Sequence, residues 1–198
     1  VFLFTWLLIL FSTYKLTQLS QSMDFVAVTI WYCFAFLGYV ALIFQADYFP
    51  KYYFYLGAIV LAAICFIELP FLSNDYFRFL WDGEMIHLGI NPYDFSPDHL
   101  IHSKDFNHCY YLDLYAGMGE LSRSNYSCYP TFNQLYFYLS TGVFKDIWTN
   151  VLLLRIFSMG TILVATIYLE KLLTEFNLNP KRSLIFLLNP LVIIESVS

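Results

Sequence analysis

The chain has 198 residues, of which 59% are hydrophobic and only 13% are charged. Soluble domains carry about 25% charged residues, so the composition excludes an ordinary soluble domain and indicates a membrane protein. The formal net charge is −5 and no basic block is present, which argues against a nucleic-acid partner.

Apolar runs along the chain predict five membrane-spanning helices. A helix needs roughly 20 apolar residues to cross the hydrocarbon core of a bilayer. The first run lacks a basic segment and a cleavage site, which favours a span over a signal peptide. Both ends of the chain lie inside apolar runs, so we expect a fragment truncated at both termini. Residues 1–198 then form one membrane domain with spans at about 1–14, 25–44, 52–72, 148–169 and 183–198.

The basic residues predict how the spans are oriented. Lys171, Lys181 and Arg182 lie in the short connection before the last span, and Lys51 precedes the third. Cytoplasmic loops are enriched in Lys and Arg, so this side of the membrane is predicted to be cytoplasmic. The long loop of residues 73–147 is then extracytoplasmic.

The long loop is predicted to contain two amphipathic helices. The first is Asp75–Leu88, with Ser73 or Asn74 as its N-cap and Gly89 as its stop. A helix of this kind can lie along a membrane surface. The second amphipathic stretch is Phe132–Phe144, which leads towards the fourth span.

Three charged residues of the first loop helix are candidates for an active site. Asp75, Arg78 and Asp82 are spaced at i, i+3 and i+7, which places them on one helical face. One carboxylate would serve as general base, and the guanidinium would bind a phosphate or orient an acid. The alternative is a solvated face with ordinary pairing.

Three further charges lie within predicted spans. By helical rise, Glu68, Arg155 and Glu195 all fall in the half of the membrane on the loop side. Buried charges in a membrane are costly and usually functional. Their shared depth predicts a polar cavity that opens towards the loop and binds substrate. The alternatives are snorkelling or a structural Glu–Arg pair.

The loop also holds cysteines, histidines and further acids. Cys109 and Cys128 are compatible with a disulfide in an extracytoplasmic loop and equally with two free thiols. The histidines and nearby acids are compatible with a divalent metal, but no zinc spacing is met and no cofactor is assigned. This group comprises Asp98, His99, His102, Asp105 and His108.

Four motifs carry a resemblance to a known family. They read SNDYFRFLWDG at residues 73–83, GINPY at 89–93, YPTFNQ at 129–134 and NPLVIIE at 189–195. In this order they resemble the motifs of a group of bacterial GT-C glycosyltransferases, often called mannosyltransferases. The chain departs from the group at Asn74, which replaces the first acid of a usual pair, and at Thr131, which replaces a proline.

The resemblance implies an all-α polytopic enzyme of the bacterial inner membrane, with its active site on the extracytoplasmic side. It implies an inverting transfer of a mannose-like hexose from a polyprenyl-phosphate donor to a glycan, lipid or protein acceptor, in contact with membrane lipids. It implies that Asp75 is the catalytic base, with Asp82 as second choice. Arg78 and Tyr129 are then substrate-binding residues.

A transporter or a lipid-handling membrane protein without glycosyl transfer is the alternative function. Intramembrane Glu and Arg residues serve transport equally well. The acidic loop with its motifs favours the transferase, because transport has no chemical need for Asp75 and Asp82 at the surface. A purely structural membrane subunit would tolerate changes at both acids.

Overall fold

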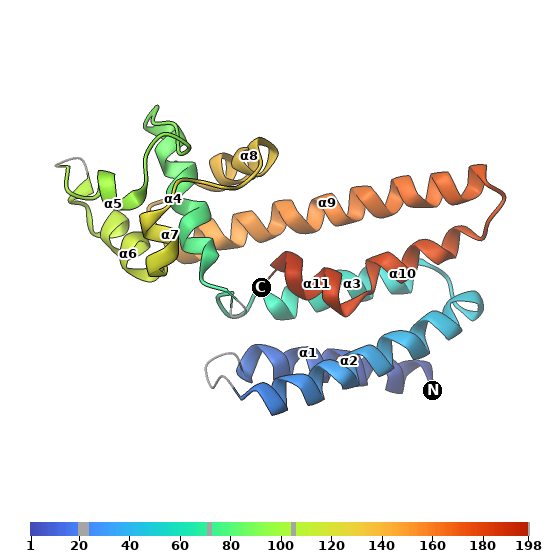
Figure 1. Ribbon diagram of the computed structural model, residues 1–198. Coiled ribbons are helices and arrows are strands. Elements are labelled where there is room, and N and C mark those ends of the chain that lie inside the picture. The colour runs from blue at the N-terminus through green and yellow to red at the C-terminus, as the bar shows by residue number, and fades with distance from the viewer. Residues whose placement is uncertain (20–23, 71–72, 104–105, 198) are drawn as a thin grey trace. The chain divides into compact units, whose positions relative to one another are not determined.

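The computed structural model describes all residues except 20–23, 71–72, 104–105 and 198, and leaves out the side chains of 195–197. The described residues form helices joined by turns, with no strand among them (Figure 1). The predicted all-helical membrane fold is therefore confirmed. The chain divides into two compact units: unit 1 comprises Val1–Leu72 and Ser158–Ser198, and unit 2 comprises Ser73–Phe157.

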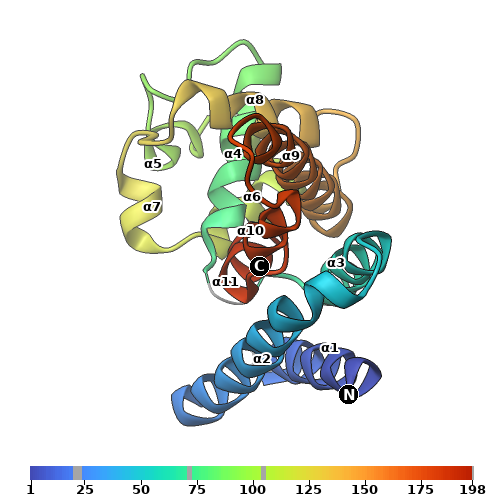
Figure 2. The ribbon, with the colours of Figure 1, turned by 90° about the vertical axis from the view of Figure 1, so that its right-hand side faces the viewer.

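Unit 1 is built from long apolar helices around an apolar core. The core includes Trp6, Leu42 and Phe54. Helices α1 and α2 lie side by side in both views (Figures 1 and 2). The elements are α1 (Phe2–Leu19), α2 (Phe25–Gln45), η1 (Ala46–Tyr48), α3 (Tyr52–Cys65), the C-terminal part of α9 (Ile147–Glu175), η3 (Pro180–Ser183), α10 (Leu184–Leu187) and α11 (Pro190–Val197).

Within the described residues, three helical segments are long and apolar enough to cross a membrane: α1, α2 with η1, and α9. Two predicted spans differ from this. The span predicted at 52–72 is helical only as far as Cys65, with residues 71–72 outside the described part. The span predicted at 183–198 is interrupted before Pro190, which has no backbone N–H to continue a helix. Asn189 caps the next helix, because its Oδ1 accepts from the Leu191 N–H at 3.0 Å.

Polar contacts connect the two short basic connections of unit 1. Lys51 Nζ donates to Glu170 Oε2 at 2.6 Å. Lys181 Nζ donates to the Ala46 carbonyl at 2.9 Å and to the Phe49 carbonyl at 3.2 Å. The connections that carry the basic residues therefore lie at the same end of this unit.

Unit 2 is organised around α4, which packs against α6 and α8 (Figure 2). Its apolar core includes Trp81, Met85, Phe106 and Leu114. The predicted first loop helix is confirmed to within one residue, whereas the second ends at Ser140 rather than Phe144. The elements are α4 (Asp75–His87), α5 (Pro97–Leu100), α6 (Cys109–Gly117), α7 (Glu120–Ser124), α8 (Thr131–Ser140) and the N-terminal part of α9.

A glycine lets α4 and α8 approach closely. A Cβ atom at Gly83 would lie 2.2 Å from the Phe137 carbonyl oxygen and 2.5 Å from Thr141 Oγ1. The obstructing oxygen of Phe137 belongs to the backbone, so it cannot move aside as a flexible side chain can. The glycine is thus a requirement of the α4–α8 packing.

We predict that Gly83→Ala destabilises the protein by about 1–3 kcal/mol, because the added methyl group overpacks this contact. Thermal unfolding of the purified full-length protein in detergent measures the effect. Gly160→Ala is the matched control, since a Cβ there meets nothing within 4 Å and alanine favours a helix interior. Equal melting temperatures for the two variants would contradict the prediction.

Candidate active site

The start of α4 holds the first signature acid. Asn74 is the N-cap residue, and the Ser73 hydroxyl accepts from the Asp75 N–H at 3.1 Å. The Asn74 side chain makes no capping bond and donates instead to the Gly117 carbonyl at 3.3 Å. An ionised carboxylate has no proton to donate, so this contact gives the asparagine at position 74 a structural role.

The second signature acid is part of a buried ion pair. Arg78 is 2% exposed and Asp82 is fully buried, and Arg78 Nε donates to Asp82 Oδ1 at 2.7 Å. Arg78 Nη1 also donates to the carbonyls of Ser122 and Asn125, the latter at 2.9 Å. The guanidinium therefore holds the C-terminal part of α7 and the residue that follows it against α4.

The other oxygen of Asp82 accepts two more hydrogen bonds. Ser127 Oγ donates to Oδ2 at 2.5 Å, and Gln134 Nε2 donates to it at 3.1 Å. Gln134 Nε2 also lies 2.8 Å from Ser127 Oγ, so the three side chains form a closed network. Asp82 is thus satisfied on both oxygens and has no contact with solvent.

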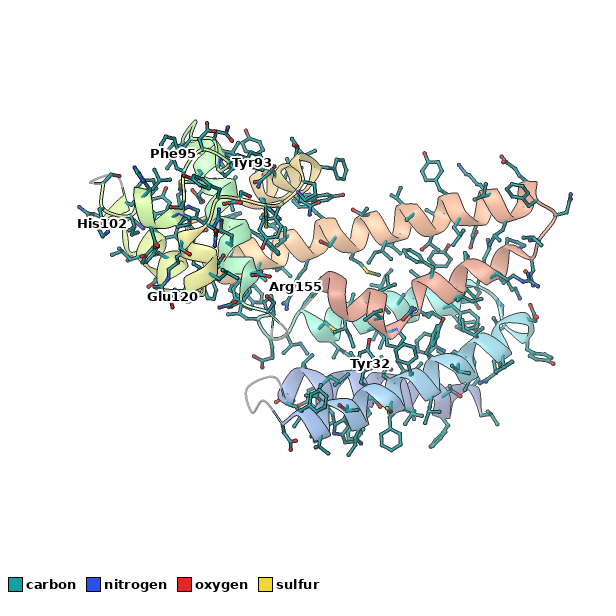
Figure 3. The ribbon with its side chains drawn as sticks, in the orientation of Figure 1. Tyr32, Tyr93, Phe95, His102, Glu120 and Arg155 are labelled. Atoms are coloured by element: carbon teal, nitrogen blue, oxygen red, sulfur yellow. The ribbon has the colours of Figure 1, made fainter. Side chains whose placement is uncertain are left out.

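The second and third loop motifs also contact each other. The Tyr93 hydroxyl donates to the Tyr129 carbonyl at 2.6 Å, and the N–H of Ser127, two residues before the third motif, donates to the Pro92 carbonyl at 3.2 Å. Figure 3 shows Tyr93 in the loop that follows α4. With the Asp82–Gln134 bond, these contacts bring all three motifs of the loop into one structure.

Asp75 differs from Asp82 in its surroundings. Its side chain is only partly buried, and among the described residues its carboxylate makes no hydrogen bond or ion pair. Burial first, and then the negative charge of Asp75, raise the pKa of the Tyr129 hydroxyl to about 12. The carboxylate and the Tyr129 hydroxyl therefore share one environment at the start of α4.

The charges predicted within the spans are found in different settings. Arg155 is 4% exposed and projects from α9 (Figure 3). Burial raises the pKa of Tyr76, and the positive charge of Arg155 partly opposes this, which places the guanidinium near the start of α4. Glu68 is partly buried beyond the end of α3, and Glu195 lies in α11 with its side chain outside the described part.

Comparison with protein families gave one match over almost the whole chain. Residues 4–198 match the model of the alpha-(1→6)-mannopyranosyltransferase N-terminal domain. The chain belongs to this family. Comparison with curated proteins and with solved structures gave no match. The mannosyltransferase character predicted from the motifs is thus confirmed, and family membership supports glycosyl transfer with a sugar donor and an acceptor.

One buried acid of the mannosyltransferase domain, Glu84, was not predicted from the sequence to have a role. Glu84 is fully buried, forms an ion pair with Lys145 and accepts from the Gly142 N–H at 3.2 Å. Lys145 also lies over the rings of Tyr110 and Tyr111, at 5.7 and 5.3 Å from the centroids. In the sequence, the only sign of a structural role for Glu84 is its position directly after the first motif, two residues from Asp82.

In the described part of the domain, the candidate metal ligands do not form a metal-binding cluster, and the two candidate cysteines do not form a disulfide. No group of three His, Cys, Asp or Glu side chains there is placed to bind a metal ion. Asp105, one of the candidates, lies outside the described residues. Cys109 and Cys128 are exposed free thiols in the structure and form no disulfide with each other.

Because the ion pair of Arg78 and Asp82 is buried, we predict that Asp82→Asn destabilises the domain. Removing one charge of a buried pair leaves the other uncompensated, at a cost of about 3–5 kcal/mol. Thermal unfolding of the full-length protein measures the loss. Asp113→Asn, at an exposed position of α6, is the control and should melt like the wild type. A wild-type melting temperature for Asp82→Asn would show that the pair contributes nothing to stability.

Proposed function

We propose that the domain takes part in moving mannose from a polyprenyl-phosphate carrier to an acceptor outside the cytoplasm, with inversion at the sugar carbon and Asp75 as base. Family membership supports the sugar and the type of reaction. The observation that carries the site assignment is the contrast between the two signature acids: Asp82 is fully buried in an ion pair, whereas Asp75 is only partly buried and its carboxylate makes no hydrogen bond or ion pair among the described residues.

The proposed chemistry needs one base and one leaving group. The Asp75 carboxylate takes the proton of the acceptor hydroxyl as that oxygen attacks the anomeric carbon. The bond between this carbon and the phosphate oxygen breaks, and the polyprenyl phosphate leaves with the electron pair. Inversion that forms the α linkage of the family description requires a donor in which mannose is β-linked to phosphate.

The departing phosphate needs a cation or hydrogen-bond donors. Arg78 is engaged with Asp82 and two carbonyls, so we assign it to positioning rather than to phosphate binding. Arg155 is our candidate for the phosphate, since its charge acts near the start of α4. The Tyr129 hydroxyl is a candidate donor, and Glu68 and Glu195 stay predictions as substrate-binding residues.

The proposed side of the membrane follows from the basic connections. Lys51 and Lys181 lie at one end of unit 1, together with their partners. The positive-inside rule makes this end cytoplasmic. Helix α9 begins at Ile147 and reaches this end at Glu170, which pairs with Lys51, so we place the start of α9 on the outer side. A lipid carrier suits that side, because nucleotide sugars are cytoplasmic. We propose the bacterial inner membrane as the location.

Replacing the base while keeping its shape tests the assignment. We predict that Asp75→Asn folds and binds donor but loses about 100- to 10,000-fold in turnover, because an amide cannot accept the proton. Transfer of labelled mannose from polyprenyl-phosphate-mannose by the full-length protein in vesicles is the measurement. Asp113→Asn is the matched control and should keep normal transfer.

Other outcomes of that assay would move or remove the site. Near-normal transfer by Asp75→Asn, with a folded but inactive Asp82→Asn, would make Asp82 the base. Near-normal transfer by both variants would exclude this acid pair. Donor binding without any transfer by the wild-type protein would favour the alternative of a transporter or lipid-handling protein.

Labelling of a single cysteine tests the orientation. We predict that Ser103→Cys, introduced into a protein without other cysteines, reacts with an impermeant maleimide in intact cells, because Ser103 is exposed in the loop. The native cysteines must be replaced, since Cys109 and Cys128 are also exposed. Labelling only after permeabilisation would reverse the topology.

A further inference from the structure

Helix α8 turns its apolar face outward. Phe132, Leu135, Tyr138 and Leu139 are 65%, 49%, 39% and 47% exposed. Their spacing of i, i+3, i+6 and i+7 places them on one stripe of the helix. In a water-soluble protein this stripe would face the core, so its exposure calls for an apolar neighbour.

The inward face of α8 explains this orientation. Gln134 and Ser140 are buried there with Phe137, whose ring stacks on Phe79 of α4 at 4.6 Å between centroids. Gln134 donates to Asp82, the buried acid of α4. Turning the apolar stripe inward would withdraw this amide from the carboxylate, so the buried charge sets which face of α8 points out.

The apolar surface continues from α8 towards a membrane-spanning helix. Val143 and Phe144 follow the stripe and are 79% and 48% exposed. Trp148, at the start of α9, is 47% exposed, and α9 is apolar and long enough to cross a bilayer. Residues 141–146 connect the two helices and span at most about 20 Å, which keeps α8 close to the point where α9 enters the membrane.

We infer that α8 lies in the membrane interface, with its apolar stripe inserted among the lipids of the leaflet that α9 enters first. Continuity with α9 identifies the neighbour as lipid, because the same chain surface enters the bilayer a few residues later. Interfacial helices bury an apolar face to a depth of about 5–10 Å. Helix α8 has no charged residue, so the insertion does not require anionic lipids. The inference is independent of the proposed reaction.

The experiment measures the surroundings of the stripe directly. Leu135→Cys and Leu139→Cys are made in the full-length protein without other cysteines, labelled with the fluorophore NBD and reconstituted into phosphatidylcholine vesicles. Asp113→Cys on α6 and Asn133→Cys, on the other side of α8, are the controls. Quenching by nitroxide-bearing lipid is compared with quenching by aqueous iodide.

We expect the labels at 135 and 139 to emit at shorter wavelength, to be quenched by the nitroxide lipid and to resist iodide. The labels at 113 and 133 should show the reverse. Iodide quenching at 135 and 139 equal to that at 113 would place the stripe in water. Protection from both quenchers would mean that protein covers the stripe, either a second copy or another part of the full-length chain. Either result overturns the inference.

Discussion

The buried charges of α4 constrain the rest of the loop. An ion pair removed from water is tolerated only when further hydrogen bonds satisfy its remaining donors and acceptors. For Arg78 and Asp82 these come from α7, the segment after it and α8, up to 52 residues away in the chain, while Arg78 Nη2 has no partner among the described residues. These segments must therefore close onto α4 before the pair is stable, which ties the positions of α7, α8 and the chain between them to this one interaction.

The same constraint separates two acids that the sequence presents as equivalent. Asp75 and Asp82 lie two turns apart on one helix and belong to one motif. Asp82 sits where α8 and the chain before it cover the helix, so both of its carboxylate oxygens accept hydrogen bonds from the protein. Asp75 lies in the first turn, where the helix dipole favours an ionised carboxylate without enclosing it. Because of their different positions along α4, Asp82 is a buried structural acid, whereas Asp75 is accessible.

How much the sequence predicts depends on how far apart the interacting residues lie. The limits of α4 rest on local patterns and were predicted to within one residue, and its N-cap Asn74 was one of the two residues predicted for that position. The hydrogen bonds from Ser127 and Gln134 to Asp82 and the ion pair of Glu84 with Lys145 were missed, because these partners lie in distant segments and no spacing rule connects them. The break before Pro190 was also missed, although its Asn-Pro pair is a local helix-start pattern, because the surrounding residues are uniformly apolar.

The orientation of α8 shows how stability and membrane contact arise from one arrangement. Sequence periodicity identifies an amphipathic helix but cannot say whether its apolar face meets protein or lipid. That choice follows from Gln134, which is needed inside the protein to satisfy Asp82. Once the amide points inward, the apolar stripe must point outward, and a bilayer is the surrounding that makes this exposure favourable. Because Tyr129 lies just before α8, the depth of this helix in the lipid would also set the height of the Asp75 environment above the membrane, where the head of a lipid-linked sugar is presented.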